Sequence, residues 1–359
     1  MCTHHASINC LVPPYMMRQL MENTGEKTAL FKTVVQSLVT DARLRSQRKV
    51  FHYLPEAGKK ILTCAPLARA TKKAAVNREV YTAGNKQTEP GKLVRAEGSK
   101  PVKDKDVNNV YDAAGYVWDF YNSLFSRNSI DNKGLKIVQT VHYKQKYDNA
   151  FWDGQQMVYG DGDGKIFGSF TQDIDVIGHE LTHGVVQYEC NLVYQDQSGA
   201  LNESLADVFG IMIKQKTLNL GVAQSDWLIG ENVMIGAKYA LRSLKAPGTA
   251  YVNHPQLGTD PQPANMSGYT NDPTDNGGVH LNSGIPNHAF YLACMKVGGF
   301  AWEKVGRIWY GAMCDKKNVP TTANFADFKN ATILQAQKLF KTDKTIEKAV
   351  TDAWTSVGV

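Results

Sequence analysis

The sequence lacks any hydrophobic run long enough to cross a membrane. A transmembrane helix needs roughly 18 to 20 consecutive apolar residues, and no run in this 359-residue chain reaches that length. The first twenty residues also lack the basic start and long apolar stretch of a Sec signal peptide. We therefore expect no membrane partner. We expect synthesis in the cytoplasm, and a non-Sec route if the protein reaches the extracellular space.

Clustered charge and compact cysteine spacing are absent too. The formal net charge is only +6, and no basic module of the kind that binds nucleic acid is visible, so no nucleic-acid partner is expected. The chain is far larger than scaffolds that depend on disulfides. We therefore predict free thiols for the six cysteines: Cys2, Cys10, Cys64, Cys190, Cys294 and Cys314.

Apolar residues make up 43% of the chain, enough for a substantial core, and the length favours two lobes over one. Hydrophobic periodicity divides the chain into three blocks, 1–67, 68–188 and 189–359. The first block contains helix-like stretches at 15–22 and 28–45. Short strand patterns mark the second block, at 136–143 and 156–159, around a helix at 107–125. Further helices are expected at 174–188, 201–216, 285–297, 301–313 and 324–340, and a long loop at 249–274.

The run His179-Glu180-Leu181-Thr182-His183 places two imidazoles four residues apart in a predicted helix. Residues at this spacing share one helix face, so both rings can bind the same ion. The carboxylate of Glu180 lies between them, where it can take a proton from a water molecule at the open metal position. This pattern predicts one catalytic zinc ion with its own general base.

Glu203, in the predicted helix 201–216, is the expected third zinc ligand. Two histidines and one glutamate form a known catalytic zinc set that leaves the fourth position for water. Asn202 and Asp207 lie beside Glu203 on this helix and can accept the outer ring N–H groups of the histidines. Such hydrogen bonds would fix the tautomers of the two rings.

Four more segments accompany the zinc motif. They read Asn-Ala-Phe-Trp at 149–152, Met-Val-Tyr-Gly-Asp-Gly-Asp-Gly at 157–164, Gly-Ala-Leu-Asn-Glu at 199–203, and Asp-Asn-Gly-Gly-Val-His-Leu-Asn-Ser-Gly-Ile at 275–285. From about residue 78 to its end, the chain resembles the thermolysin-like zinc metallopeptidases. The short N-terminal block with Pro13-Pro14-Tyr15 is most similar to the protealysin-type branch.

This resemblance implies an α+β fold. A mixed β lobe would be followed by an α-helical lobe, with the zinc helix between them and a small helical propeptide, residues 1–67, in front. It also implies a monomeric neutral endopeptidase that cuts peptides and proteins on the N-terminal side of hydrophobic residues. The precursor would process itself, and its own propeptide would be a partner. An ordinary helical subdomain that stays attached is the alternative for the first block.

The resemblance assigns further roles. His280 and Tyr194 would donate hydrogen bonds to the oxyanion, and Asp275 would hold the His280 ring. Three groups would bind the substrate main chain: Asn149, the Ala150 backbone and Arg242. Four positions would line the pocket for the residue after the scissile bond: Phe167, Val176, Val233 and Leu241. Core packing explains these four apolar residues equally well.

Calcium is where the sequence departs from this family. The acidic residues Asp175, Asp226 and Glu231 match the paired calcium site, but Lys214 and Leu228 stand where further acids would be. A fixed ammonium opposes a second divalent ion. We therefore expect one calcium ion at most, or none with Lys214 supplying the charge. The segment 161–164 is expected to be a tight turn.

Other interpretations remain open. A zinc-binding inhibitory or interaction protein without turnover is opposed by the intact Glu180. An interaction module could be formed by the residues before about 67. An aminopeptidase would need a carboxylate motif for a free amino terminus, and the sequence shows none. Cys10 could place a thiolate on the open zinc position and silence the enzyme, although cysteines more often simply pack.

Overall fold

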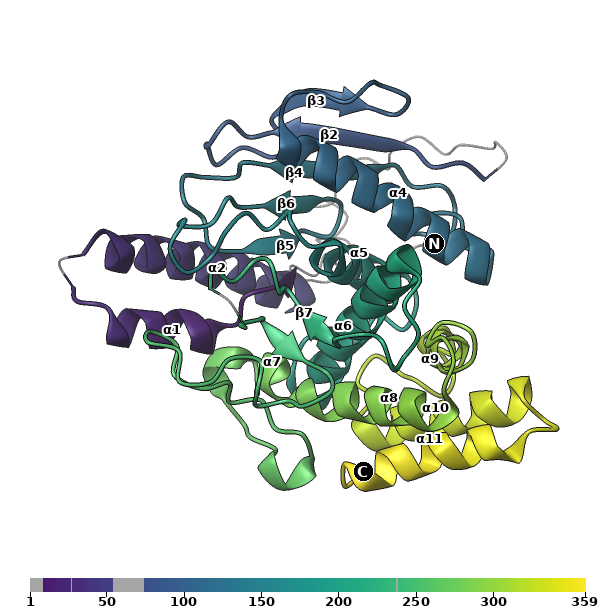
Figure 1. The fold of residues 1–359 in the computed structure, drawn as a ribbon. Helices are drawn as coiled ribbons and strands as arrows, with labels where there is room; N and C mark the ends of the chain where they lie inside the picture. The colour runs from purple at the N-terminus through teal and green to yellow at the C-terminus, as the bar shows by residue number, and fades with distance from the viewer. Residues whose placement is uncertain (1–8, 27, 54–73, 237) are drawn as a thin grey trace. The chain divides into compact units, whose positions relative to one another are not determined.

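The computed structural model describes residues 9–26, 28–53, 74–236 and 238–359 (Figure 1). These residues form two compact units. The first comprises Met1–Tyr188 with Asn232–Ala237, and the second comprises Glu189–Glu231 with Lys238–Val359. The expected end of the first block, at residue 67, lies outside the described residues, as do Cys2 and Cys64.

A six-stranded sheet forms the centre of the first unit, in the order β1-β5-β6-β4-β2-β3. β4 pairs in parallel with β2 and with β6, whereas the other neighbours are antiparallel. The residues of β5 and β6 are all buried, as expected for strands covered on both faces. The strands are β1 (Asn9–Cys10), β2 (Arg78–Thr82), β3 (Lys92–Ala96), β4 (Ile137–Val141), β5 (Ala150–Trp152) and β6 (Met157–Tyr159).

Four helices accompany this sheet among the described residues: α1 (Pro14–Asn23), α2 (Ala29–Tyr53), α4 (Lys105–Phe125) and α5 (Ile174–Tyr188). α1 and α2 pack side by side, and α4 lies along the sheet at β2, β3 and β4 (Figure 1). α4 begins two residues before its predicted start because Asp104 caps it, accepting the N–H groups of Asp106 and Val107. α5 packs against α4 and β5.

The second unit is mainly helical. Its helices are α6 (Asp196–Leu218), α7 (Val279–Asn282), α8 (Gly284–Val297), α9 (Val305–Met313), α10 (Phe325–Leu339) and α11 (Lys344–Ser356). Its short elements are β7 (Leu228–Ile229), β8 (Arg242–Ser243), and the 3-10 turns η1 (Met266–Gly268) and η2 (Pro273–Asp275). α6 is buried along most of its length because α7, α8, α9 and β7 pack around it. Trp309 stacks on Trp354 with ring centroids 6.1 Å apart, joining α9 to α11.

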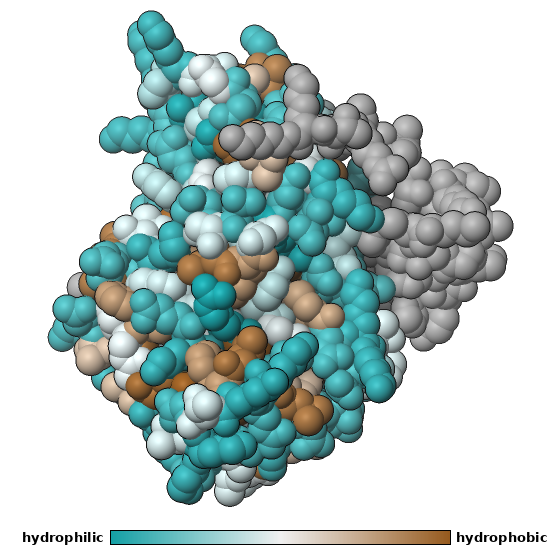
Figure 2. Space-filling view, turned by 90° about the vertical axis from the view of Figure 1, so that its right-hand side faces the viewer, coloured by the Kyte–Doolittle hydropathy of each residue, from teal (hydrophilic) through white to brown (hydrophobic). Residues whose placement is uncertain are grey.

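The visible surface in Figure 2 is mostly hydrophilic, with apolar residues in separate patches. Within the part of the chain that the structure describes, no helix combines the length and apolar character needed to span a membrane.

Candidate metal and catalytic site

The zinc motif lies on α5, the helix predicted at 174–188 with these same bounds. His179 and His183 are fully buried, and their Nε2 atoms are 3.0 Å apart. α5 is held closely against its neighbours. Tyr121 of α4 hydrogen-bonds to Thr182, whose hydroxyl also donates to the Gly178 carbonyl. A Cβ atom at Gly184 would lie 2.6 Å from Ile130 and 3.0 Å from Trp152, so glycine allows this close packing.

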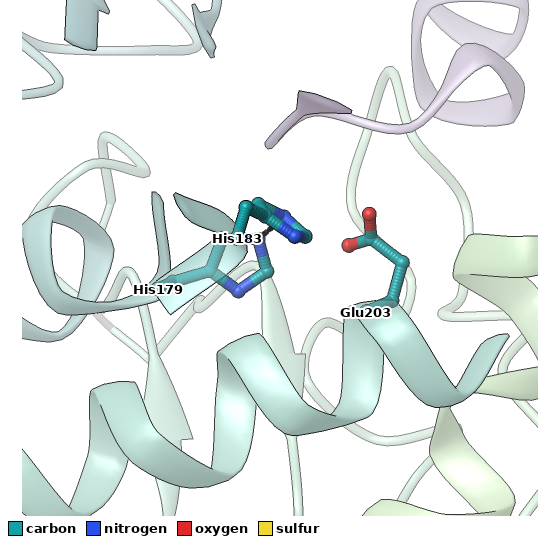
Figure 3. Close-up of side chains that lie close together, drawn as sticks. All are labelled: His179, His183 and Glu203. Atoms are coloured by element: carbon teal, nitrogen blue, oxygen red, sulfur yellow. Dashed lines mark hydrogen bonds between the residues drawn. The ribbon is translucent and has the colours of Figure 1, made fainter. Parts of the chain in front are cut away.

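The two imidazoles and Glu203 of α6 form a group suited to a metal ion (Figure 3). Their ligand atoms lie within 4.8 Å of one another, and all three side chains are buried. Two nitrogens bound tetrahedrally to one zinc ion would be about 3.3 Å apart, given Zn–N bonds of about 2.0–2.1 Å. The observed 3.0 Å between the Nε2 atoms is close to that separation. The donor set therefore fits zinc, and Glu180, fully buried, follows His179 directly.

A second cluster surrounds Glu203 within the helical unit. The Tyr194 hydroxyl donates to Glu203 and lies 3.1 Å from Nε2 of His280. Nδ1 of His280 is 2.5 Å from Oδ1 of Asp275. The other oxygen of Asp275 accepts the backbone N–H groups of His280 and Leu281, at 2.9 and 3.3 Å. The structure thus brings together His280, Tyr194 and Asp275, which the sequence analysis selected.

The turn before His280 depends on two glycines. Gly277 and Gly278 both have φ near +83°, in the left-handed region that favours glycine. A Cβ atom on Gly277 would lie 1.9 Å from the Asp196 carboxylate. The glycines therefore allow the chain to turn sharply between η2 and α7, where Asp275 meets His280.

Arg242 lies in a buried pair that the sequence analysis missed. Its guanidinium donates to both oxygens of Asp207, from Nε at 2.8 Å and from Nη2 at 2.9 Å. Asn287 donates to the same carboxylate at 2.9 Å. The side chain of Asn202 donates to the Leu192 carbonyl at 3.3 Å. This fork fixes the plane of the Arg242 guanidinium. Support of the histidines by Asp207 and Asn202 stays a prediction.

The expected substrate-binding residues of the sheet contact the N-terminal segment of the same chain. The Val12 N–H donates to Oδ1 of Asn149 at 2.8 Å, and Nδ2 of Asn149 donates to the Val12 carbonyl at 3.3 Å. The Leu11 N–H donates to the Ala150 carbonyl at 3.0 Å. Cys10 of β1 pairs with Phe151 of β5. The N-terminal segment therefore already binds the side chain of Asn149 and the backbone carbonyl of Ala150 in this chain.

Cys10 is 2% exposed and packs with Ala83, Tyr143, Tyr147, Phe151 and Val158. These neighbours agree with a packing role for Cys10. Cys190 and Cys294 are buried free thiols, and burial raises the pKa of Cys190 to about 12.

The four expected pocket residues, Phe167, Val176, Val233 and Leu241, are all fully buried. Burial of this degree fits pocket lining and core packing alike. The segment 161–164 is a tight turn in which Asp163 accepts the N–H groups of residues 165, 166 and 167.

Lys214 reaches the acids predicted for calcium. Its ammonium donates to Asp226 at 2.9 Å, to Glu231 at 3.3 Å and to the Leu228 carbonyl at 3.4 Å. Burial opposes ionisation of Asp226, but the Leu228 amide and Lys214 together hold its pKa below the usual value. The ammonium thus occupies the position between two carboxylates. Asp175, the third acid, is fully buried in the first turn of α5.

Two histidines on one helix and a glutamate on another are the ligand set of a class of zinc-dependent hydrolases. The mixed sheet beside the zinc helix agrees with this class. The model of the thermolysin metallopeptidase catalytic domain matches residues 52–187, and that of the thermolysin metallopeptidase alpha-helical domain matches residues 190–359. The chain therefore belongs to the thermolysin family of metallopeptidases and is a metalloendopeptidase. The predicted family and α+β fold are confirmed.

Individual proteins are similar over nearly the whole chain. An extracellular metalloprotease of Pectobacterium carotovorum subsp. carotovorum is 46% identical over 355 residues, which cover 97% of this chain and 96% of that protein. Protease PrtS of a Photorhabdus species is 42% identical over 357 residues, or 97% and 91% of the two chains. The solved precursor of protealysin, a metalloproteinase from Serratia proteamaculans, superimposes with a TM-score of 0.84 at 43% identity, covering 98% and 99%.

Proposed function

We propose that this protein is a zinc-dependent neutral endopeptidase that is made as a precursor and cuts on the N-terminal side of hydrophobic residues. The main support for this proposal is the buried group of His179, His183 and Glu203, with Glu180 next in sequence to the first histidine. These three ligands would hold one zinc ion, which when bound lowers the pKa of a water molecule and polarises the substrate carbonyl.

The protein's own residues supply the remaining steps. Glu180 would accept the proton of the attacking water and pass it to the leaving nitrogen. The Tyr194 hydroxyl and the His280 ring would donate hydrogen bonds to the developing oxyanion, each contributing about 3–4 kcal/mol as such donors do in other hydrolases. Asp275 is a positioning residue, since it binds both the ring and the backbone of His280.

Asn149, Ala150 and Arg242 would bind the substrate main chain. The contacts of Leu11 and Val12 support this role for the first two, because they join the backbone of another segment to the Asn149 side chain and the Ala150 carbonyl. The same contacts support a silent precursor, in which the N-terminal block must leave before a substrate can bind. Phe167, Val176, Val233 and Leu241 would line the pocket that selects Leu, Phe, Ile or Val.

We infer that the enzyme acts outside the cell, since the Pectobacterium relative is named an extracellular metalloprotease. The mature enzyme would act as a monomer. The calcium content would be one ion at most, because Lys214 already bridges two of the expected ligands.

The test is the substitution Glu180→Gln. The variant should bind as much zinc as the wild type, because Glu180 is not one of the three ligands. After mild trypsin treatment to remove the N-terminal block, it should cleave casein and a Gly-Leu peptide at least about a hundredfold more slowly. Glu303→Gln, at an exposed position, is the matched control and should behave as wild type.

Three outcomes separate the candidates. Undiminished turnover by E180Q would remove the general-base assignment. A wild-type chain that holds zinc but cuts nothing after trypsin treatment would favour the zinc-binding protein without turnover. Cleavage only at free amino termini would favour an aminopeptidase.

A further inference from the structure

Helix α2 presents a polar face to the sheet through Ser37, Thr40 and Asp41, which lie three and four residues apart on one side of the helix. All three are buried, with exposed fractions of 2%, 4% and 1%. Ser37 Oγ accepts the Asp148 N–H at 3.2 Å, and Thr40 Oγ1 accepts from the Lys144 ammonium at 2.6 Å. This face therefore covers the segment between β4 and β5.

Asp41 contributes the charged group of this face. One of its carboxylate oxygens accepts the Tyr147 hydroxyl at 2.6 Å, and the other accepts Nδ2 of Asn149 at 2.9 Å. Tyr147 and Asn149 flank Asp148 in sequence. Asn149 is also the residue whose side chain binds the Val12 backbone. The carboxylate of α2 thus holds a side chain that we assign to substrate binding.

Asp148 lies beneath this face with only partial compensation. It is fully buried, and neither oxygen of its carboxyl group has a hydrogen-bond partner. Burial raises its pKa well above the usual value, and the charges of Asp163 and Asp41 raise it further, whereas the Asp163 amide and Lys146 offset only part of the rise. Burying a carboxylate is very costly, so the carboxyl group holds its proton more tightly while α2 covers it.

The other titratable groups here do not neutralise Asp148. Lys144 and Lys146 lie in the same loop, yet neither hydrogen-bonds to its carboxyl group. Asp163 uses one oxygen to accept three backbone N–H groups of its own turn. The remaining titratable neighbours of this region are Arg43 of α2, Tyr143 and Tyr147 of the loop, Cys10 of β1, and Glu89, whose pKa is raised mainly by burial.

We propose that the polar face of α2 and the protonated carboxyl group of Asp148 form a proton-dependent latch, which holds the N-terminal block on the sheet at low pH and weakens as the pH rises. When α2 lifts away, water can reach Asp148, and its carboxyl group can ionise near the ordinary value of about 4. Docking of α2 on the sheet is then accompanied by uptake of one proton by Asp148. The docking constant should fall by up to tenfold per pH unit above about pH 4, until the group also ionises under α2.

Only the consequence of the latch rests on the proposed function. Release of Asn149 and Ala150 would open the site that binds the main chain of the substrate. A low external pH would preserve the silent precursor, and neutral pH would favour its maturation.

Hydrogen–deuterium exchange of the full chain tests the latch without any need for activity. The measurement follows the amides of α2 residues 29–41 between pH 5 and 8, in an E180Q chain that cannot process itself. The second chain carries E180Q with Asp148→Asn, which keeps the shape of a neutral carboxyl group. Comparison of the two chains at the same pH cancels the intrinsic pH dependence of exchange. Ser37→Ala is the matched control, since it removes an interface hydrogen bond but no ionisable group.

In the E180Q chain, protection of α2 should fall with pH by up to tenfold per unit. With D148N added, protection should be higher at pH 7–8 and nearly independent of pH. S37A should lower protection equally at every pH and keep the slope. Asp41→Asn should also weaken docking, since it removes the charge from two hydrogen bonds. An unchanged slope after addition of D148N, or protection in the E180Q chain that does not respond to pH, would overturn the latch while leaving the proposed peptidase activity untouched.

Discussion

His280 depends on one carboxylate for both its ring and its backbone. Asp275 binds Nδ1 of the imidazole with one oxygen and two backbone N–H groups with the other. The ring therefore enters the site with its Nε2 atom directed to the Tyr194 hydroxyl. In the proposed mechanism His280 would then need no reorientation during the reaction, which is how fixed hydrogen bonds favour a transition state.

Replacing Asp275 by Asn should therefore lower kcat by about ten- to a hundredfold, because the charged anchor of His280 is lost. KM should change little, since the oxyanion forms only in the transition state. The measurement is steady-state cleavage of a Gly-Leu peptide after removal of the N-terminal block, with zinc content determined in parallel. Thr274→Ala, one residue earlier and exposed to solvent, should leave both constants unchanged. A variant that loses only substrate affinity would contradict the positioning role.

At the scale of elements, His142 joins three parts of the sheet unit. It follows β4, and its ring nitrogens contact Asp161 after β6 at 2.8 Å and Asp104, the cap of α4, at 2.9 Å. The hydrogen bond to Asp161 raises the pKa of His142 to about 9 with help from Asp104, although burial acts in the opposite direction. In the folded protein His142 is therefore an imidazolium at neutral pH. This residue was not among those predicted from the sequence.

The stabilisation from His142 should depend on pH with a defined sign. Because its folded pKa is raised above the unfolded value of about 6.5, the contribution is complete below pH 6.5 and disappears as the pH rises to about 9. His142→Gln should cost of the order of 2 kcal/mol at pH 6, after allowance for screening of the partly exposed carboxylates. Urea unfolding of E180Q chains with and without H142Q, from pH 6 to 10, measures this difference.

The two curves should converge near pH 9 to 10, and Asp161→Asn should remove part of the same effect. A gap between H142Q and its parent that stays constant over this range would mean that packing, and not charge, connects the three elements.

Elements with a local periodic signal were predictable, and elements made by distant partners were not. The helix 174–188 was predicted with its observed bounds because its apolar and metal-ligating residues repeat at helical spacing. β1 has two residues and exists only through pairing with β5, about 140 positions away, so no local pattern indicates it. α11 was missed although Ile346, Val350 and Trp354 give it an apolar face and Asp343 caps it. That signal was present in the sequence.

The same distinction between local and distant partners applies to the residues of the site. The zinc motif and its third ligand could be selected because their residue types and spacing carry the chemistry. The pairing of Arg242 with Asp207 could not, because the two residues lie 35 positions apart and charged residues are common. The hydrogen bonds of Asn149 with Val12 and Asp41 likewise depend on how the N-terminal block folds back.

At the scale of the whole molecule, Lys214 is expected to make stability independent of calcium. Its ammonium supplies positive charge between Asp226 and Glu231, where the family pattern has a divalent ion. The melting temperature of the E180Q chain, loaded with zinc, should be the same with and without millimolar calcium.

Lys214→Glu should create a calcium response, because it adds a carboxylate to two that are already close. The melting temperature of this variant should rise by roughly 2–4 °C per kcal/mol of binding energy when calcium is added. Differential scanning fluorimetry measures the shift. Lys214→Met, which removes the charge without adding a ligand, should lose stability and gain no response. A wild-type chain that calcium stabilises would mean that the ion binds despite the ammonium.

The short pairing of β1 with β5 also has a consequence for which proteins can be digested. β5 accepts its neighbour through main-chain hydrogen bonds, and these demand an extended backbone. A stretch that replaces β1 must therefore first be pulled out of any helix or compact fold in its own protein. If a substrate takes the place of β1, as the proposed function requires, damaged or unfolded chains and extended linkers meet this demand, whereas a folded protein should resist cleavage whatever its leucine content.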